Sequence, residues 1–233
     1  MRYAIISDIH GNLPALTAAL AHIDTIDIDR IVCLGDIVGY GSDPVACLDL
    51  VRSRTEYVVL GNHDFAAVNI PARRDFNSHA AKAIVWTAQQ LSPADKAYIK
   101  TLPYRLGIDT MLFVHASPDH PERMRYILTA MEAKQQAQAF SERVCFVGHS
   151  HRPYIFALDP HMREYDSEHR FLINVGSVGQ PRDGDNRLAF CVLDTVAGSC
   201  DIVRLAYDID AAAAGILAAG LDRRLAERLI RGE

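Results

Sequence analysis

The sequence predicts an α/β protein whose functional side chains gather where strands end. Two apolar runs near its start, residues 3–6 and 31–34, are each followed by a polar loop and an amphipathic segment. A third apolar run at 57–60 ends in another polar cluster, and the second half of the chain is richer in strand-like runs. Alternating strands and helices are typical of a mainly parallel sheet, in which the loops after the strands carry the functional groups.

The helices are predicted from apolar residues that recur at helical spacing. They cover four segments: 13–24, 43–51, 76–101 and 129–140. Asp43 is a plausible cap of the second segment, and Ser92-Pro93 opens a new helix within the third. The chain from Asp208 onward is alanine-rich and helical, with a break at Gly220 and one last helix whose apolar face carries Leu221, Leu225 and Leu229.

The remaining strands are predicted from short apolar runs bounded by Gly and Asp clusters. Two of them end in histidine motifs: 111–114 and 143–147. Four more follow along the chain: 153–158, 170–175, 188–194 and 200–205.

Composition narrows the class of protein. A chain of 233 residues with 49% hydrophobic residues can bury a sizeable core without disulfides. The net charge of −5 and the pI near 6.0 argue against a broad basic face for nucleic acid, so a short oligonucleotide is the only nucleic-acid substrate we retain. No apolar stretch approaches the roughly 20 residues that span a bilayer, so we expect no membrane partner.

The cysteines and the N-terminus indicate a cytoplasmic protein. The five cysteines, an odd number, are scattered without a CxxC spacing, which is typical of a reducing compartment. The chain enters an apolar strand at Tyr3, which leaves no room for a signal peptide.

Five polar clusters carry the chemistry, and each follows an apolar run. In order they are Asp8-x-His10, Gly35-Asp36, Gly61-Asn62-His63-Asp64, His115 and Gly148-His149-x-His151. Carboxylate, amide and imidazole ligands from separate strand ends suit divalent first-row metals and not a thiolate zinc site. The glycines permit close backbone approach where the chain must wrap an ion or a phosphate.

These five clusters resemble, in order, the signature of the calcineurin-like metallophosphoesterases, and the resemblance runs from Tyr3 to His151. It implies a four-layer α-β-β-α sandwich of two mixed sheets flanked by helices. It also implies one metallophosphoesterase domain over residues 1–233, with a helical insertion at roughly 65–102 bordering the active-site cleft.

The resemblance also implies two metal sites that share one carboxylate. The first would comprise Asp8, His10, Asp36 and His151, and the second Asp36, Asn62, His115 and His149. The expected cofactors are two divalent transition-metal ions, with Mn²⁺ first and Fe, Ni²⁺ or Zn²⁺ as alternatives.

The implied catalytic residues are His63 as general acid and Asp64 as the residue that orients it. Two ions about 3.5–4 Å apart can activate a bridging hydroxide for in-line attack on phosphorus. A histidine with a pKa near 6.5 can then protonate the leaving oxygen. Asp64 has an alternative role that is nearly as plausible, as a cap of the helix that follows it.

Two further segments resemble the small bacterial and archaeal phosphodiesterase branch of this family. The segment 174–185 is similar to its glycine-rich loop, in which Arg182 could bind a phosphate; the alternative is an ion pair with Asp183 or Asp185. The stretch 76–87 is similar to its helical insertion. Asn12 is a candidate substrate contact, although a helix cap is the favoured role because Pro14 follows.

The function expected from these motifs is hydrolysis of a small-molecule phosphodiester or phosphomonoester, with the diester favoured. Dinucleoside polyphosphate hydrolysis or protein phosphatase activity would use the same centre. A non-catalytic metal-binding scaffold is the alternative of another class, which the complete motif set and His63 count against. The natural substrate, the metal and the oligomeric state are not determined by the sequence.

Overall fold

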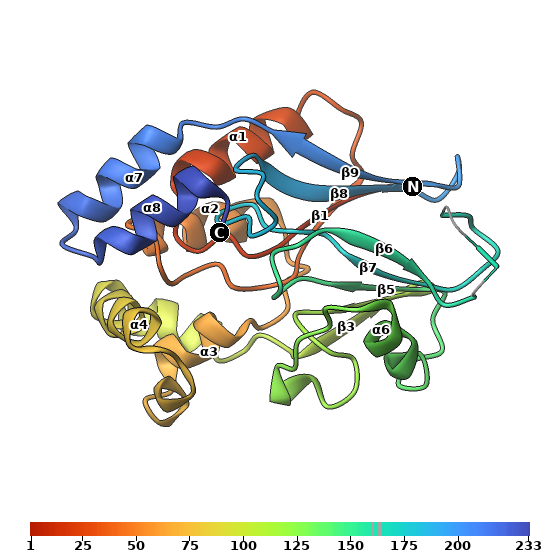
Figure 1. Ribbon diagram of the computed structural model, residues 1–233, viewed down its shortest axis with the longest axis horizontal. Helices are drawn as coiled ribbons and strands as arrows, with labels where there is room; N and C mark the ends of the chain where they lie inside the picture. The colour runs from red at the N-terminus through yellow and green to blue at the C-terminus, as the bar shows by residue number, and fades with distance from the viewer. Residues whose placement is uncertain (160, 163–164) are drawn as a thin grey trace.

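The computed structural model describes residues 1–159, 161–162 and 165–233, apart from the side chain of Asp75. Its strands form two sheets that lie face to face (Figure 1). The four-stranded sheet has the order β2-β1-β8-β9, with β1 Arg2–Ile6, β2 Arg30–Cys33, β8 Leu188–Asp194 and β9 Ser199–Leu205. The five-stranded sheet has the order β3-β4-β5-β7-β6, with β3 Arg105–Ile108, β4 Met111–Val114, β5 Val144–Val147, β6 Tyr154–Ala157 and β7 Phe171–Asn174.

Both sheets are mixed, as expected from the family resemblance, and the prediction of a mainly parallel sheet is corrected. Parallel pairing is confined to β1 with β2, β4 with β5, and β5 with β7. The other named pairs are antiparallel: three join strands that are consecutive in the chain, and the fourth joins β1 to β8. The strands that carry the polar clusters therefore lie in the parallel parts, where their carboxyl ends share one edge.

Strand alternation separates the cores of the sandwich. Tyr3 and Ile5 of β1 face the other sheet and pack with Phe113 and Phe146 between the two sheets. Ala4 and Ile6 point to the opposite face, where helices cover the four-stranded sheet. Since the segment 127–140, which contains a helix, covers the outer face of the five-stranded sheet, the predicted four-layer arrangement is confirmed.

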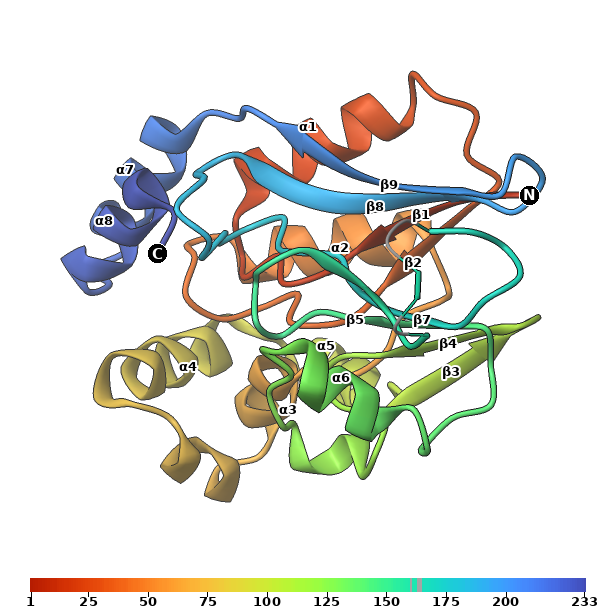
Figure 2. The same cartoon turned by 45° about the vertical axis from the view of Figure 1, so that its right-hand side comes forward.

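The helices occupy the outer layers and one end of the molecule (Figures 1 and 2). On the four-stranded sheet lie α1 Leu13–Ile23 and α2 Pro44–Arg54, and on the five-stranded sheet lies α6 Ala130–Gln136. Between β2 and β3 come α3 Asn62–Val68, a 3₁₀ turn Pro71–Asp75, α4 Ser78–Gln90 and α5 Pro93–Ile99. The chain ends in two packed helices, α7 Ile209–Ala218 and α8 Arg223–Arg231. Gly220 between them has a φ of +70°.

Three predicted elements differ from the observed ones. The run 57–60 makes a single parallel bridge from Val58 to Cys33, because the Leu60 amide donates to Pro103 and leaves the sheet. The edge strand β3 was not predicted, since its exposed positions are an arginine and a glycine. The helix predicted over 129–140 ends at Gln136, where Arg170 donates hydrogen bonds to the carbonyls of the following turn.

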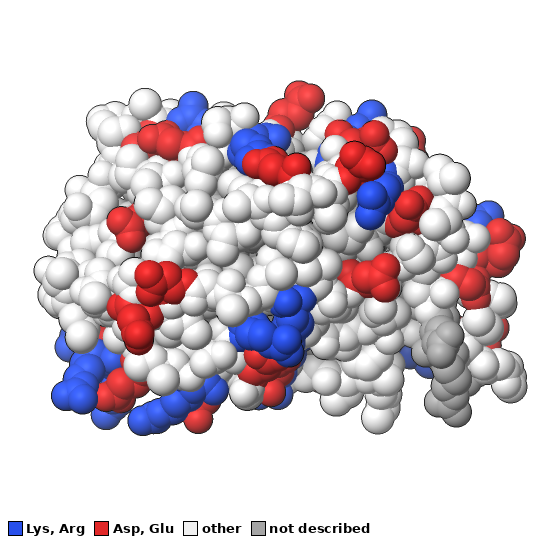
Figure 3. Space-filling view, turned by 90° about the horizontal axis from the view of Figure 1, so that it is seen from above, with Lys and Arg blue, Asp and Glu red and all other residues white. Residues whose placement is uncertain are grey.

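Charge is scattered over the surface. On the face shown in Figure 3, basic side chains lie in small groups beside acidic ones and form no continuous stripe. Among the described residues, no helix is both long and apolar enough to cross a membrane.

The two phenylalanines between the sheets should dominate stability. Phe113 and Phe146 are register partners on β4 and β5, fully buried and stacked with centroids 5.2 Å apart. We expect Phe146→Ala to lower the free energy of unfolding by about 3–5 kcal/mol, because it removes buried surface and leaves a cavity. Urea denaturation measures this, with Val196→Ala, at an 86% exposed position, as the control. A loss below about 1 kcal/mol would contradict this packing.

Candidate metal centre

The five polar clusters meet at one edge of the sandwich. Asp8 and His10 follow β1, and Asp36 follows β2 at the same end of the four-stranded sheet. His115 follows β4, while His149 and His151 follow β5, so parallel pairing brings these loops together as well. Asn62 joins them as the first residue of α3.

One group of donor atoms forms around Asp8. Nε2 of His151 lies 3.2 Å from Oδ1 of Asp8 and 3.1 Å from Nε2 of His10. Nε2 of His10 lies 3.6 Å from Oδ2 of Asp36. All four side chains are buried. They are the residues expected to form the first metal site.

A second group forms on the other side of Asp36. Nε2 of His115 lies 3.4 Å from Oδ2 of Asp36, 3.0 Å from Oδ1 of Asn62 and 3.2 Å from Nδ1 of His149. These are the residues expected to form the second site. Oδ2 of Asp36 faces both groups, which is the position expected of a shared ligand.

Each central carboxylate is anchored through one oxygen and leaves the other free. Oδ2 of Asp8 accepts from the His149 amide at 2.9 Å, and Oδ1 of Asp36 accepts from the His63 amide at 2.8 Å. The opposite oxygens, Oδ1 of Asp8 and Oδ2 of Asp36, are buried and have no hydrogen-bond partner among the described residues. Both free oxygens point at imidazole nitrogens.

Two of the histidines are oriented by backbone carbonyls. Nδ1 of His115 lies 2.8 Å from the Leu34 oxygen, and Nδ1 of His151 lies 2.5 Å from the Gln180 oxygen. With Nδ1 donating its proton, Nε2 of each ring presents a lone pair to the donor group.

The backbone is forced into unusual conformations around these donors. Five residues of the two groups have φ values between +51° and +63°, a region that is uncommon for residues other than glycine and in which Asn, Asp and His are enriched: Asp8, His10, Asp36, His149 and His151. Such strain costs on the order of 1–3 kcal/mol per residue and concentrates at functional sites. The backbone at Gly61 also passes so close to Asp36 that a Cβ at this position would collide with the Asp36 carboxylate.

Burial and mutual repulsion keep most of the imidazoles neutral. Burial lowers the pKa of His149 to about 3, with the charge of His115 adding to the effect. The pKa values of His10 and His151 are also lowered, chiefly by burial. His115 is the exception, since Asp36 overcomes burial and raises its pKa to about 9.

The carboxylates remain ionised. Burial alone would raise the pKa of Asp8 and Asp36, but neighbouring imidazoles outweigh it and hold both below the usual range. Two ionised carboxylates with free buried oxygens, among imidazole nitrogens that crowd one another, require a cation to balance them. An all-oxygen-and-nitrogen donor set fits divalent first-row metals, and Asp8 with His10 and His151, and Asp36 with His115 and His149, are candidate metal-binding groups.

His63 lies in the cleft beside the donor groups. Its ring contacts those of His10, Tyr40 and Phe76, with centroids 4.4–4.8 Å apart. Burial, together with the charge of Arg182, lowers the pKa of His63 to about 4 even though Asp36 opposes this.

Asp64 makes no hydrogen bond to the His63 imidazole, so the geometry favours the alternative role of a helix cap over the orienting role. Its two oxygens accept from the backbone amides of Val38, at 3.0 Å, and Gly61, at 3.3 Å. Asp64 therefore caps α3 and ties it to the loop after Asp36. Nδ1 of His63 has no hydrogen-bond partner among the described residues.

Asn12 is the cap of α1, and the expected substrate contact is corrected. Its Oδ1 accepts from the Ala15 amide at 3.1 Å, while its Nδ2 donates to the Gly179 carbonyl at 2.8 Å and the Tyr207 hydroxyl at 3.3 Å. Because these two bonds use both Nδ2 hydrogens, the side chain has no donor left for a ligand.

Arg182 does reach the cleft. The alternative ion pairs with Asp183 and Asp185 are not formed, since these carboxylates are bound by Arg204 and Arg187. The Arg182 side chain instead donates to Oε1 of Gln180 at 3.0 Å.

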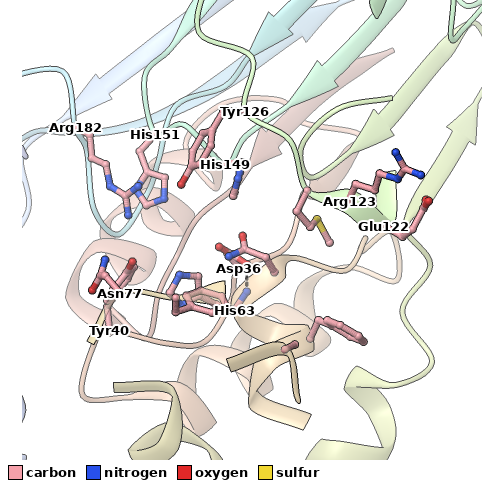
Figure 4. Close-up of a pocket in the computed structure, with 15 residues that line it drawn as sticks. Asp36, Tyr40, His63, Asn77, Glu122, Arg123, Tyr126, His149, His151 and Arg182 are labelled. Carbon is pink, nitrogen blue, oxygen red and sulfur yellow. Dashed lines mark hydrogen bonds between the residues drawn. The ribbon is translucent and has the colours of Figure 1, made fainter. Parts of the chain in front are cut away.

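The donor groups open into a cleft of about 350 Å³. Figure 4 shows one wall with Arg182, His151, His149 and Tyr126, facing Asp36, His63, Tyr40 and Asn77. The chain between β2 and β3 contributes Phe65 of α3, Ala72 of the 3₁₀ turn, and Phe76 and Asn77 of the link before α4.

Two aromatic residues of the cleft were missed by the sequence analysis. The Tyr126 ring stacks on His149 with centroids 4.0 Å apart, and Tyr40 packs against His63. Tyr126 lies outside the motifs, in the loop after His115, and no local pattern singles it out. Tyr40 follows Gly39 and has a φ of +57°, but a turn there is equally well explained without a site.

Comparisons with known proteins agree with this geometry. A model of the calcineurin-like phosphoesterase superfamily domain matches residues 1–198. An uncharacterized protein of Methanocaldococcus jannaschii is 36% identical over 239 residues, covering 98% of this chain and 97% of that protein. The crystal structure of a metallophosphoesterase from Sphaerobacter thermophilus has 38% identity and a TM-score of 0.87, covering 100% of this chain and 99% of that one.

A more distant structure shares the fold alone. Hypothetical protein PH1004 from Pyrococcus horikoshii has 18% identity and a TM-score of 0.84, covering 100% of this chain and 98% of that chain. With the family model spanning most of the sequence and two relatives above 30% identity over nearly the whole chain, this protein belongs to the calcineurin-like phosphoesterase superfamily.

Proposed function

We propose that this protein is a dinuclear metal-dependent phosphoesterase that acts on a small-molecule phosphodiester. The observation that carries the proposal is the position of Asp36, whose free buried oxygen faces two separate groups of nitrogen and oxygen donors. A single ion would leave one of these groups uncompensated, whereas two ions sharing Asp36 would satisfy both.

The proposed ligands follow from the two groups. Asp8, His10, Asp36 and His151 hold one ion, and Asp36, Asn62, His115 and His149 hold the other. When bound, the pair would supply an activated water and the positive charge that stabilises phosphoryl oxygens. Mn²⁺ is the first candidate for a mixed histidine and carboxylate set, and Fe, Ni²⁺ and Zn²⁺ are the others.

The protein's own side chains would orient the ester and handle the proton. Arg182 supplies a guanidinium that binds anionic oxygens of the substrate. His63 borders both the donor groups and the open cleft, so it is the proposed proton donor to the leaving oxygen. Because burial favours its neutral form, the negative charge of the arriving phosphate is needed to favour protonation.

The cleft supports a diester more than a monoester. Apolar side chains of the insertion, including Phe65 and Phe76, line one part of it, while Tyr40 and Arg182 line another. A phosphorus atom held between these parts has room for a substituent on each side. Dinucleoside polyphosphate hydrolysis and protein phosphatase activity use the same centre and are tested by the same assays.

We further propose that the whole chain works as one domain, with the helices between Asn62 and Ile99 as the cleft wall.

The five cysteines are buried free thiols, which supports a cytoplasmic location.

Metal content and turnover should depend together on Asp36. We expect the wild type to carry or take up about two metal ions per chain and to hydrolyse a bis-aryl phosphate faster than a mono-aryl phosphate in Mn²⁺. Asp36→Asn should lose metal and at least about 100-fold in turnover, since it removes a charge shared by both groups. Elemental analysis and a colorimetric assay measure these, with Asp201→Asn, at an exposed position of β9, as the control.

Three outcomes would contradict the proposal. Binding of no metal would overturn the ligand assignments. Binding of one ion that survives Asp36→Asn would overturn the dinuclear centre. Full metal content with no hydrolysis of either ester, or of a dinucleoside polyphosphate or a phosphopeptide, would favour the non-catalytic scaffold.

His63 should affect turnover without affecting metal content. We expect His63→Ala to retain its metals and lose about 100-fold or more in kcat for esters with poor leaving groups. The loss should be smaller for a nitrophenyl ester, whose leaving oxygen needs little protonation. An equal loss for good and poor leaving groups would exclude the proton-donor role, and His169→Ala, at a partly exposed site before β7, is the matched control.

Asp64 should act through stability. We expect Asp64→Ala to lower the free energy of unfolding by about 1–3 kcal/mol, because two buried backbone amides lose their acceptor. Thermal unfolding and the dependence of turnover on pH distinguish this from an orienting role. A changed pH profile with unchanged stability would restore the orienting role.

A further inference from the structure

Two arginine side chains lie against one tyrosine ring at the edge of the cleft. The guanidinium carbon of Arg182 is 5.8 Å from the centroid of the Tyr40 ring, and that of Arg228 is 5.9 Å from it. Tyr40 itself is only 6% exposed and lines the cleft beside His63. Both positive groups therefore lie against a residue that contacts the proposed catalytic His63, and Arg182 itself lines the cleft.

Neither guanidinium has a carboxylate side chain within 4 Å among the residues that the structure describes. Arg182 donates one hydrogen bond to the neutral Gln180 side chain. Its buried Nε has no hydrogen-bond partner among the described residues. Nε of Arg228 donates to the main-chain oxygen of Glu233 at 2.8 Å, and its guanidinium also interacts with the Tyr40 hydroxyl and the charge of Glu233. Neighbouring arginines differ, since Arg204 and Arg187 bind Asp183 and Asp185.

The positive charge of Arg182 disfavours the charged form of Arg228. Burial, and next the charge of Arg182, lower the pKa of Arg228. Two like charges kept together in half-buried positions are unfavourable unless an anion lies between them.

The position of Arg228 is fixed by contacts at both ends of its helix. Leu225 and Leu229 of α8 pack into the apolar cluster that contains Tyr40. Asp222, which caps α8, contacts Nδ1 of His79 on α4 at 2.6 Å. Figures 1 and 2 both place α8 and α4 at the same end of the molecule, so these contacts tie the last helix to the cleft wall.

We propose that Arg182 and Arg228 form a second anion subsite, which takes a phosphate group of the substrate other than the one hydrolysed. The substrate class is then a phosphoester that carries an additional phosphate, such as a nucleoside polyphosphate. A phosphate suits the pair better than a carboxylate, because its three free oxygens can accept from two guanidinium forks at once. Anion binding at this subsite does not depend on the proposed function. Only the identity of the hydrolysed phosphate rests on the proposed function.

Anion binding tests the subsite independently of catalysis. Calorimetry on the purified full-length protein, with inorganic pyrophosphate as the probe, gives Kd for the wild type, Arg182→Met, Arg228→Met and the double variant. Metal content is measured before and after each titration, so that loss of metal is not mistaken for binding. Arg231→Met is the matched control, since Arg231 is on the same helix but exposed and near Glu227 and Glu233.

We expect Arg228→Met to weaken pyrophosphate binding about tenfold, and the control to leave it unchanged. The double variant should lose less than the product of the two single losses, because both side chains hold one anion. Equal Kd values for the wild type and Arg228→Met, an equal loss in Arg231→Met, or strictly multiplicative losses would overturn the subsite. If binding behaves as expected but no ester is hydrolysed, the proposed function fails and the subsite stands.

Turnover then identifies the substrate class. The ratio of kcat/KM for a nucleoside polyphosphate ester to that for a bis-aryl phosphate should fall about tenfold in Arg228→Met, and remain unchanged in Arg231→Met. An unchanged ratio in Arg228→Met, with pyrophosphate binding weakened, would overturn the assignment of the subsite to the substrate.

Discussion

The burial of two carboxylates among imidazoles is the constraint on which the rest of this structure depends. Asp8 and Asp36 are almost wholly removed from water, and an isolated buried carboxylate is far too costly to remain ionised. Each is stabilised by one backbone amide and by neighbouring imidazole nitrogens, which leaves one oxygen directed into the space between them. A divalent cation is the partner that completes this arrangement. The need to balance buried charge, which would otherwise destabilise the fold, therefore also defines the site.

The two sheets supply the rigidity that this arrangement needs. Left-handed backbone at Asp8, Asp36 and His149 is unfavourable, and it persists only because strands on either side hold the chain in place. Where the loops cross, glycine is required: a side chain at Gly61 would displace the Asp36 carboxylate. Phe113 and Phe146, packed between the sheets, keep the strand ends in register. Packing energy from the core thus maintains strained geometry at the edge.

Chemistry and selectivity come from different parts of the fold. Most donor residues follow strand ends, whereas the cleft walls come from other segments: the chain between Phe65 and Asn77, the loop containing Tyr126, and the loop that carries Arg182. The centre recognises phosphorus, and these walls decide which substituents can approach it. Arg182 links the cleft wall to the centre, since its charge lowers the pKa of His63 and of His151.

The sequence alone indicated that the polar motifs would lie at one edge, because each motif directly follows an apolar run and strand ends share an edge. It also determined most helices, whose apolar spacing is local. Tertiary structure decided what depends on contacts between distant segments: His10 meets His151 across 141 residues, and Tyr40 meets Arg228 only because α8 packs beside it. It also decided the role of Asp64, whose oxygens face the Val38 and Gly61 amides and not His63. Such roles depend on which partner lies within hydrogen-bond distance, and spacing along the chain does not contain that information.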